Sequence, residues 1–280
     1  MKKVLILGAT GMLGSAVYGV LKDKYELTLT VRSKEKIALL QSAYGGTDKH
    51  HVIEFDARND GEYLRGFFDT VQDVDFAVNA VGITQPFAAT DPALTYFING
   101  DLPHLLAKTF GPRLIHIATD GVYDGKNGPY DETSEKSPAG VYAESKSRGE
   151  PDGCLTLRTS IIGREIESKT GLLEWFLRQN GATVKGFTHH FWNGITTIEF
   201  GNICDKLISD PKLRPSAGIY HIFSSTVSKY DMLCAFKEKL GVNCEIIPES
   251  GSVVNRTLAT IHTLNADLEI PSFEKMLAQL

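Results

Sequence analysis

The sequence predicts an α/β fold in which helices cover both faces of a parallel, doubly wound sheet. Residues 4–7 are four consecutive apolar residues, a pattern typical of a parallel strand that is buried on both faces. A glycine-rich turn follows at once, and strand-like and helix-like segments then alternate as far as residue 163. Repeated strand–helix units of this kind form parallel sheets, because each helix crosses back over the sheet between two strands.

The alternation is regular in the first part of the chain. After the strand at 4–7, we expect helices at 15–24, 37–44, 62–71, 92–110 and 142–149, and strands at 26–31, 51–55, 75–81, 114–118 and 154–162. Pro103 requires a bend or a break in the helix at 92–110, because proline donates no backbone hydrogen bond. Residues 124–138 are rich in Gly, Pro, Asp and Ser, which predicts a loop.

The pattern after Gly163 is less regular. It predicts helices at 172–179, 228–240 and 273–280, a further helix within 194–207, and strands at 218–223 and 245–247. We therefore divide the 280 residues into a larger domain at 1–163 and a smaller C-terminal lobe at 164–280. Segments within about 194–225 are expected to return to the first domain.

Composition and charge argue against several classes of partner and site. The formal net charge is −5, whereas nucleic-acid binding normally requires a clustered basic surface, so no such partner is expected. The apolar run at the N-terminus is too short for a signal peptide or a membrane span, which predicts a cytoplasmic protein. No metal site is expected, because the cysteines lack metal-binding spacing and the adjacent His189 and His190 would point to opposite faces of a strand.

Three glycines, Gly8, Gly11 and Gly14, lie three residues apart between the first strand and the first helix. Such glycines permit a tight turn, a close approach of phosphate to the backbone and close packing of helix on strand. The helix N-terminus adds unpaired N–H groups and the positive end of a dipole. An ordinary turn is the alternative, but the context favours a Rossmann-type dinucleotide site. The cofactor phosphates are then expected on Gly8, Thr10, Gly11, Met12, Leu13 and Gly14.

Arg32 and Ser33 follow the second strand, where proteins that bind NAD tend to carry an acidic residue for the ribose 2′-hydroxyl. An arginine and a serine can instead bind the 2′-phosphate of NADP. The sequence thus predicts that NADPH is preferred and that NAD is possible. The alternative is that Arg32 is a solvated surface residue.

Small or polar residues also follow the third and fourth strands. Asp56, next to Ala57, could accept a hydrogen bond from the adenine amino group, or it could cap the next segment. Ala80, Val81 and Gly82 end the fourth strand, where small side chains let a cofactor run along the strand ends. We place all five residues in the predicted cofactor site.

Tyr142 and Lys146 are four residues apart and share one face of a predicted helix. A nearby ammonium group, together with the positive nicotinamide ring, favours tyrosinate and lowers the pKa of the tyrosine, which allows proton exchange with a carbonyl or hydroxyl near neutral pH. Thr119 ends the fifth strand, beside the expected cofactor crevice, and its hydroxyl can donate to the same substrate oxygen. The simpler interpretation of Thr119 is a strand-end residue that bonds to local backbone.

Together, Gly8-x-x-Gly11-x-x-Gly14, Thr119 and Tyr142-x-x-x-Lys146 resemble the extended short-chain dehydrogenase/reductase family. Several longer segments look like its dTDP-4-dehydrorhamnose reductase branch: 116–125, 130–132, 142–150, 157–163, the strand 218–222, and Asn99 with Pro103. The resemblance covers most of residues 1–225.

This resemblance implies that a 4-keto group on a nucleotide-linked deoxysugar is reduced by a nicotinamide cofactor. Tyr142 would donate the proton, Lys146 would hold down the pKa of Tyr142 and bind the nicotinamide ribose, and Thr119 would orient the carbonyl. Asn99 would belong to the cofactor site. Family analogy also suggests a homodimer and a substrate-binding role for the C-terminal lobe.

The expected substrate contacts depart from the branch at two places. An Arg-Pro pair is common near the C-terminus of the branch, whereas this chain has Arg256-Thr257, and its segment 192–197 lacks the usual proline before threonine. Thr84 and Gln85 could face the sugar or solvent, and Arg164 could pair with a diphosphate or lie on the surface. The full set of expected substrate contacts is Thr84, Gln85, Asp120, Val122, Arg164, Asn193 and Arg256.

Two alternatives remain open from the sequence. One is a nucleotide-sugar epimerase or dehydratase with tightly bound NAD, because dehydratases usually have an acidic residue beside the catalytic threonine, as Asp120 is here. The other is a non-catalytic cofactor-binding regulatory subunit. Such proteins tend to lose the Tyr or the Lys, and this chain keeps both Tyr142 and Lys146.

Overall fold

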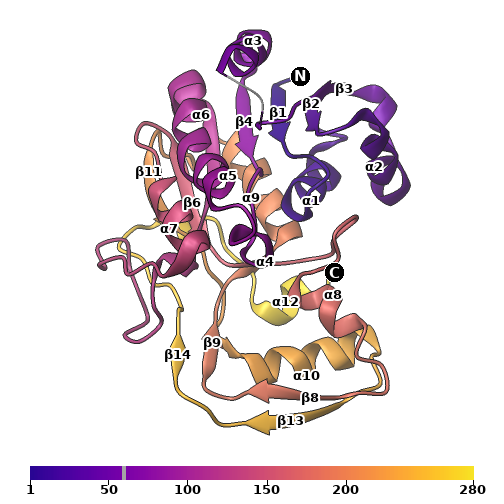
Figure 1. The fold of residues 1–280 in the computed structure, drawn as a ribbon, viewed down its shortest axis with the longest axis vertical. Helices are drawn as coiled ribbons and strands as arrows, with labels where there is room; N and C mark the ends of the chain where they lie inside the picture. Colours follow the sequence, from indigo (N-terminus) through magenta and orange to yellow (C-terminus); the bar gives the residue numbers. More distant parts are fainter. Residues whose placement is uncertain (59–60) are drawn as a thin grey trace.

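A seven-stranded sheet forms the centre of the protein in a computed structural model that describes residues 1–58 and 61–280 (Figure 1). All of its strands run parallel, in the order β11-β6-β5-β4-β1-β2-β3. The order reverses between β1 and β4, which confirms the doubly wound Rossmann-like fold. The strands are β1 (Lys3–Leu7), β2 (Glu26–Val31), β3 (His51–Glu54), β4 (Phe76–Asn79), β5 (Leu114–Thr119), β6 (Leu155–Thr159) and β11 (Gly218–His221).

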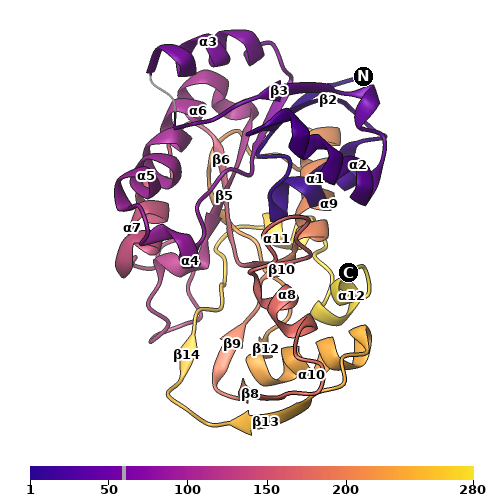
Figure 2. The ribbon, with the colours of Figure 1, turned by 45° about the vertical axis from the view of Figure 1, so that its right-hand side comes forward.

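Helices cover both faces of this sheet, as Figure 2 shows from a second direction. One face carries α1 (Met12–Leu21), α2 (Ile37–Tyr44), α9 (Thr197–Ser209) and α11 (Leu264–Asp267). The other side carries α3 (Gly61–Val71), α4 (Gln85–Ala88), α5 (Pro92–Tyr96), α6 (Leu102–Phe110) and α7 (Gly140–Arg148). Strand β1 lies between the two layers, and its successive side chains alternate between them: Val4 and Ile6 join the α1/α9 core, whereas Leu5 and Leu7 join the α3/α6 core. This double burial explains the unbroken apolar run at residues 4–7.

A smaller lobe lies below the sheet in Figure 1 and has its own apolar core. Phe176, Trp192, Met232, Phe236 and Phe273 are its largest buried side chains. Its elements, and the short strands that lead into it, are β7 (Ile161–Ile162), α8 (Leu172–Leu177), β8 (Thr183–Phe187), β9 (His190–Trp192), β10 (Ile195–Thr196), β12 (Val227–Ser228), α10 (Lys229–Leu240), β13 (Glu245–Glu249), β14 (Val254–Asn255) and α12 (Phe273–Leu277).

The structure corrects three predicted elements. The first helix begins at Met12 and ends at Leu21, because its N-terminus forms directly on the glycine turn. The expected strand at 154–162 is two strands, β6 and β7, which belong to different sheets. The expected helix at 92–110 is interrupted by a π-helical turn at Phe97–Asp101, just before Pro103.

Four short strands, β8, β9, β12 and β14, were not predicted from the sequence. In β8 only Val184 and Gly186 face the interior, and a glycine at an inward position hides the expected alternation of apolar residues. The other three have two or three residues each and exist through pairing with distant segments. Local patterns cannot reveal such pairings.

Gly14 should not tolerate a side chain, because a Cβ atom built on it would lie 2.2 Å from the carbonyl oxygen of Gly8. We expect Gly14→Ala to lower the free energy of unfolding by about 1–3 kcal/mol through this overlap. Gly66→Ala on α3 is the matched control, since a Cβ built there would meet no described atom within 4 Å beyond the backbone of its own helix. That change should raise stability by up to about 1 kcal/mol through helix propensity. Urea unfolding measures both, and equal effects of the two substitutions would contradict the packing described.

Candidate active site

The candidate site lies at one edge of the central sheet. Because the strands are parallel, β1, β4, β5 and β6 all end there, and ligands of open α/β sheets bind outside these carboxyl ends. Glycines after β1, small residues after β4, Thr119 at the end of β5 and the start of α7 therefore meet at the same edge.

The glycine turn is shaped for a phosphate-bearing ligand. Gly8 has φ of +78°, a left-handed conformation that favours glycine, and its N–H donates to Thr30 Oγ1 at 2.9 Å. Gly11 caps α1 without any side-chain hydrogen bond, and the first turn of the helix contains no acidic residue. The N–H groups and the positive end of the helix dipole thus meet no side-chain anion of the helix itself, which fits a diphosphate.

The loop after β4 lies against this turn. A Cβ on Gly8 would lie 3.1 Å from Val81 Cγ2 and 3.3 Å from the carbonyl carbon of Ala80. Asn99, buried in the π-helical turn, binds the backbone of Ile83 through both ends of its amide, at 2.8 and 2.9 Å. Its amide nitrogen also lies 3.2 Å from Ser145 Oγ on α7. Asn99 thus ties the loop that contains Gly82 to α7, which carries Tyr142 and Lys146. The sequence predicted Asn99 as a cofactor contact and did not predict this structural role.

The residues after β2 and β3 lie at the outer part of this edge. Arg32 is exposed, and the hydroxyl of Ser33 donates to the carboxylate of Glu35.

Asp56 accepts hydrogen bonds from the side chain and the backbone of Arg58. The hydrogen bond from the Arg58 guanidinium lowers the pKa of Asp56, and the charge of Arg32 lowers it further. Ala57 is buried in the α3/α6 core. Asp56 is therefore already engaged with protein donors, and Ala57 contributes packing.

Thr119, Tyr142 and Lys146 converge at the end of β5. Gly121 lies against the side chains of both Thr119 and Tyr142, and the Thr119 hydroxyl is close enough to lower the pKa of Tyr142. The Lys146 ammonium is buried and donates to the carbonyl oxygen of Ile117 at 2.9 Å. The three side chains predicted to be catalytic thus form one cluster beside the carboxyl edge.

Burial is the main influence on the protonation of this cluster. Burial raises the pKa of Tyr142, with the Thr119 hydrogen bond opposing this shift. Burial also lowers the pKa of Lys146 to about 8. In the folded chain by itself, the Lys146 ammonium points to the Ile117 carbonyl, and burial is the main influence on the pKa of Tyr142. The predicted lowering of this pKa by the ammonium together with a nicotinamide ring stays a prediction.

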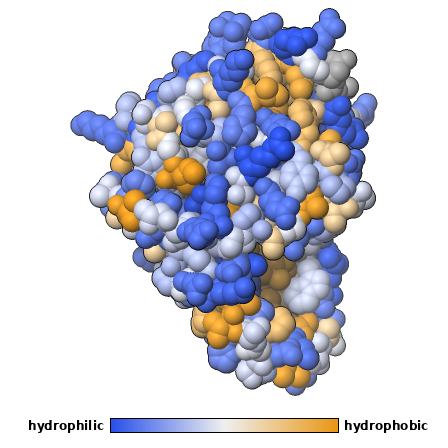
Figure 3. All heavy atoms as spheres, turned by 60° about the vertical axis from the view of Figure 1, so that its left-hand side comes forward, coloured by the Kyte–Doolittle hydropathy of each residue, from blue (hydrophilic) through white to orange (hydrophobic). Residues whose placement is uncertain are grey.

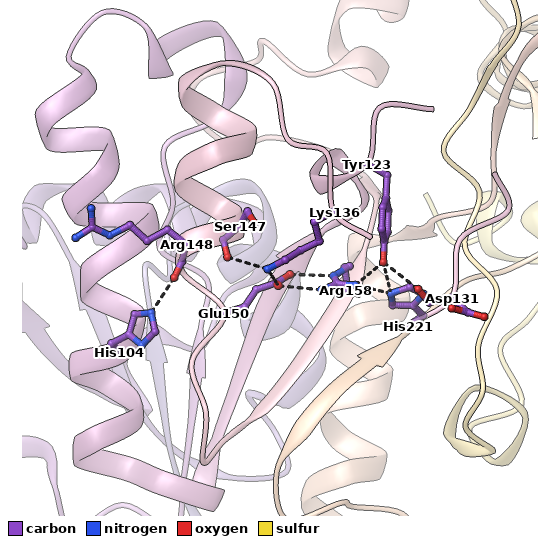
Figure 4. A network of polar contacts seen from close by, with 9 residues as sticks. All are labelled: His104, Tyr123, Asp131, Lys136, Ser147, Arg148, Glu150, Arg158 and His221. Carbon is purple, nitrogen blue, oxygen red and sulfur yellow. Dashed lines mark hydrogen bonds and ion pairs between the residues drawn. The ribbon is translucent and has the colours of Figure 1, made fainter. Parts of the chain in front are cut away.

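A buried polar network anchors the end of α7 (Figure 4). Glu150 follows α7 and receives two hydrogen bonds from the Arg158 guanidinium, at 2.9 and 2.8 Å, with both side chains 3% exposed or less. Arg158 also donates to the hydroxyl of Tyr123 at 2.6 Å and lies 2.8 Å from Nε2 of His221. Residues from β6, β11, the end of α7 and the loop after β5 are thereby tied together.

The expected substrate residues fall into two groups. Thr84 and Gln85 are exposed at the start of α4, Arg256 is exposed and Asp120 is partly exposed. Asp120 follows Thr119 directly, and the charge of Arg256 acts on its carboxylate. Arg256 also donates to the Tyr123 carbonyl at 2.9 Å.

Arg164 is half exposed, and its guanidinium pairs with the buried carboxylate of Glu174 at 2.8 Å. This carboxylate would compete with a diphosphate for the Arg164 guanidinium.

Two other expected substrate contacts are buried in the protein. Val122 is fully buried and packs with Tyr123, Tyr130 and Leu258, so its side chain does not line an open site. Asn193 is 5% exposed, and its amide binds the backbone of Leu258 in both directions, at 2.8 and 2.9 Å. Both residues therefore act structurally here, because their contacts are already taken by protein atoms.

Glu150, Arg158, His221 and Lys229 had no role predicted from the sequence. An arginine in the otherwise uncharged strand 155–159 was an available signal, because a buried charge must find a partner. Lys229 offered no local signal. Among residues 1–58 and 61–280, no group of three or more His, Cys, Asp or Glu side chains could hold a metal ion, and no helix is long and apolar enough to cross a membrane.

The family model described as "RmlD substrate binding domain" matches residues 1–259. The chain belongs to this family. Solved structures with the same fold include a dTDP-4-dehydrorhamnose reductase from Bacillus anthracis in complex with NADP, at a TM-score of 0.74, 17% identity and coverage of 100% of this chain and 98% of that one. A UDP-N-acetylglucosamine 4-epimerase from Methanobrevibacter ruminantium has a TM-score of 0.76 at 16% identity, covering 99% and 96%.

The curated relatives include proteins of two kinds. Methionine adenosyltransferase 2 subunit beta of Danio rerio is 26% identical over 268 residues, which span 88% of this chain and 77% of that protein. The dTDP-4-dehydrorhamnose reductase of Mycobacterium tuberculosis strain H37Rv is 40% identical over 85 residues, which span 27% of this chain and 28% of the reductase. The chain is therefore similar both to a reductase and to a subunit of a different enzyme.

The Glu150–Arg158 pair should matter far more for stability than a surface ion pair. We expect Glu150→Gln to lower the free energy of unfolding by about 3–5 kcal/mol, because it leaves a buried guanidinium without its counter-charge. Glu249→Gln is the control, since it breaks an exposed pair with Lys185 and should cost at most about 1 kcal/mol. Chemical denaturation compares the two variants, and a loss for Glu150→Gln no larger than the control's would contradict the assigned role of this network.

Proposed function

We propose that this protein is a reductase that uses NAD(P)H to reduce a keto group, at C4, on a nucleotide-linked deoxysugar. The observation that carries the proposal is the convergence of Thr119, Tyr142 and Lys146 beside the glycine turn. Membership of the family and the NADP complex of the Bacillus anthracis reductase support it. The cytoplasmic location and the homodimer remain predictions.

Separate residues would bind the cofactor, donate the proton and orient the substrate. The turn at Gly8–Gly14 and the N-terminus of α1 would hold the cofactor phosphates, and the nicotinamide ring supplies a hydride when the cofactor is bound. Tyr142 donates its proton to the carbonyl oxygen as the ketone becomes an alcohol, and the Thr119 hydroxyl orients that oxygen. Lys146, four residues further along α7, would favour the loss of this proton together with the positive nicotinamide ring.

A second candidate function is a binding subunit of another enzyme. It is favoured by the relatives named methionine adenosyltransferase 2 subunit beta, which match 88% of the chain in the case of Danio rerio. The protein would then bind the cofactor and a partner without turnover. An epimerase or dehydratase also remains a candidate, because Asp120 lies beside Thr119 and an epimerase shares the fold. NAD that survives purification would favour this third possibility.

Replacing the proposed proton donor tests the chemistry. With a nucleotide 4-keto-sugar that the wild type reduces, Tyr142→Phe should lower turnover about 100-fold or more while NADPH still binds, because only the proton donor is lost. Tyr220→Phe on β11 is the matched control and should keep full turnover. Turnover and fluorescence titration of NADPH measure the two effects. Unchanged turnover in Tyr142→Phe would exclude the acid role, and no reduction of any sugar in a broad panel would exclude the substrate class.

Cofactor preference is proposed to depend on Arg32, which is exposed just after β2. Arg32→Ala should raise the KM for NADPH about tenfold or more, because one charge-assisted hydrogen bond to the 2′-phosphate is lost, and should leave the KM for NADH unchanged. Lys49→Ala removes an exposed cation before β3, at the opposite end of the strands, and serves as the control. Equal changes for the two cofactors would show that Arg32 does not select NADPH.

A further inference from the structure

Lys229 is an unassigned cation at the junction between the lower lobe and the sheet. It is the first residue of α10, and Ser228 caps the helix by accepting the backbone N–H of Asp231 at 3.0 Å. Strand β12, which ends at Ser228, pairs with β9 and thereby fixes the approach to the helix. The side chain of Lys229 runs beside Trp192 of β9, with its ammonium 5.7 Å from the ring centre.

The ammonium group of Lys229 makes no conventional ion pair. It takes part in none of the ion pairs formed by residues 1–58 and 61–280, and its only hydrogen-bond neighbour within that part of the chain is the sulfur of Met232, at 3.9 Å. The residue is partly buried, and burial lowers the pKa of its ammonium. A partly desolvated cation without an oxygen partner is costly, so its presence here favours a partner outside the folded chain.

The charge of Lys229 interacts with the carboxylate that follows Thr119. This carboxylate belongs to Asp120. Its negative charge raises the pKa of Lys229 and so opposes the effect of burial. Arg256 acts on the same carboxylate from the loop after β14. Burial nevertheless raises the pKa of Asp120 to about 6, so the two cations do not hold it fully in its ordinary range. Two positive groups thus share one weakly acidic carboxylate, which leaves positive charge available to an anion.

We propose that Lys229 binds a phosphate oxygen of the nucleotide diphosphate carried by the substrate, and so selects nucleotide-linked sugars over free sugars. The inference rests on the proposed function, in which the reacting ketone lies at Tyr142 and Thr119. The anomeric carbon of a hexose, which carries the diphosphate, lies across the ring from C4. In the proposed binding mode, a sugar whose C4 oxygen meets Tyr142 directs its diphosphate away from β5, toward the lower lobe that carries Lys229. The Lys229 ammonium lies over the Trp192 ring, a cation–π contact that orients the charge.

Binding of dTDP and UDP to the full-length protein, with NADP⁺ saturating so that the cofactor site is filled, tests the proposal by calorimetry. Lys229→Met keeps the stem and removes the charge, and it should weaken the tighter of the two nucleotides about tenfold or more, since a charge-assisted hydrogen bond is lost. Binding of the corresponding nucleoside, which lacks phosphate, should not change between the two proteins. Lys237→Met, an exposed position on the same helix, is the matched control and should bind as wild type does.

Further outcomes separate this proposal from its alternatives. If Lys229 acts only through Asp120, then Lys229→Met will have no effect on nucleotide affinity in an Asp120→Asn background, and the proposal is overturned. A tenfold loss that persists in that background supports direct contact with phosphate. The proposal is also overturned if wild type and Lys229→Met bind the nucleotide with equal affinity. It is overturned as well if wild type binds neither dTDP nor UDP. Because binding is measured without turnover, failure of the reductase proposal would appear separately, as absent reduction of keto-sugars.

Discussion

The parallel direction of all seven strands is the constraint that organises the whole protein. Parallel strands place every carboxyl end at one edge, so residues far apart in the sequence meet there without any local signal. Gly8 follows β1, Val81 follows β4, and Thr119 ends β5. The close contact between Gly14 and Gly8 then sets α1 against the same edge, with its N-terminus directed at the site.

Helix α7, which carries Tyr142 and Lys146, is held in place from two sides. Asn99 joins its Ser145 to the loop after β4, and the Glu150–Arg158 pair joins its end to β6. Between these anchors Tyr142 is partly buried, which keeps its proton on the hydroxyl. Figure 3 shows that, on one face of the molecule, a hollow with hydrophobic atoms in its depth separates the lower lobe from the larger upper part. Lys229 and Arg256 lie on segments that link this lobe to the sheet.

Features that depend on local order could be predicted from the sequence. The glycine spacing, the apolar run of β1 and the i, i+4 pair of Tyr142 and Lys146 each follow from geometry within one element, and the fold and the cluster agree with them. Features set by distant contacts were missed. The burial of Val122 and the bonding of Asn193 depend on Leu258, which is 65 residues beyond Asn193 in the chain. The lack of an ion-pair partner at Lys229, among the described residues, depends on how β9 and α10 are brought together, which no local pattern predicts.

Whether Thr119 and Tyr142 hold a sugar ketone for reduction can be measured by following a label from cofactor to product. NADPH deuterated at either of the two C4 positions of its nicotinamide ring is mixed with the protein and a panel of nucleotide 4-keto-sugars, and the sugar product is analysed by mass. We expect one of the two labelled cofactors, and not the other, to transfer its deuterium to the former carbonyl carbon. If both cofactors bind and neither labels any sugar in the panel, the assignment of this site as a reductase is contradicted.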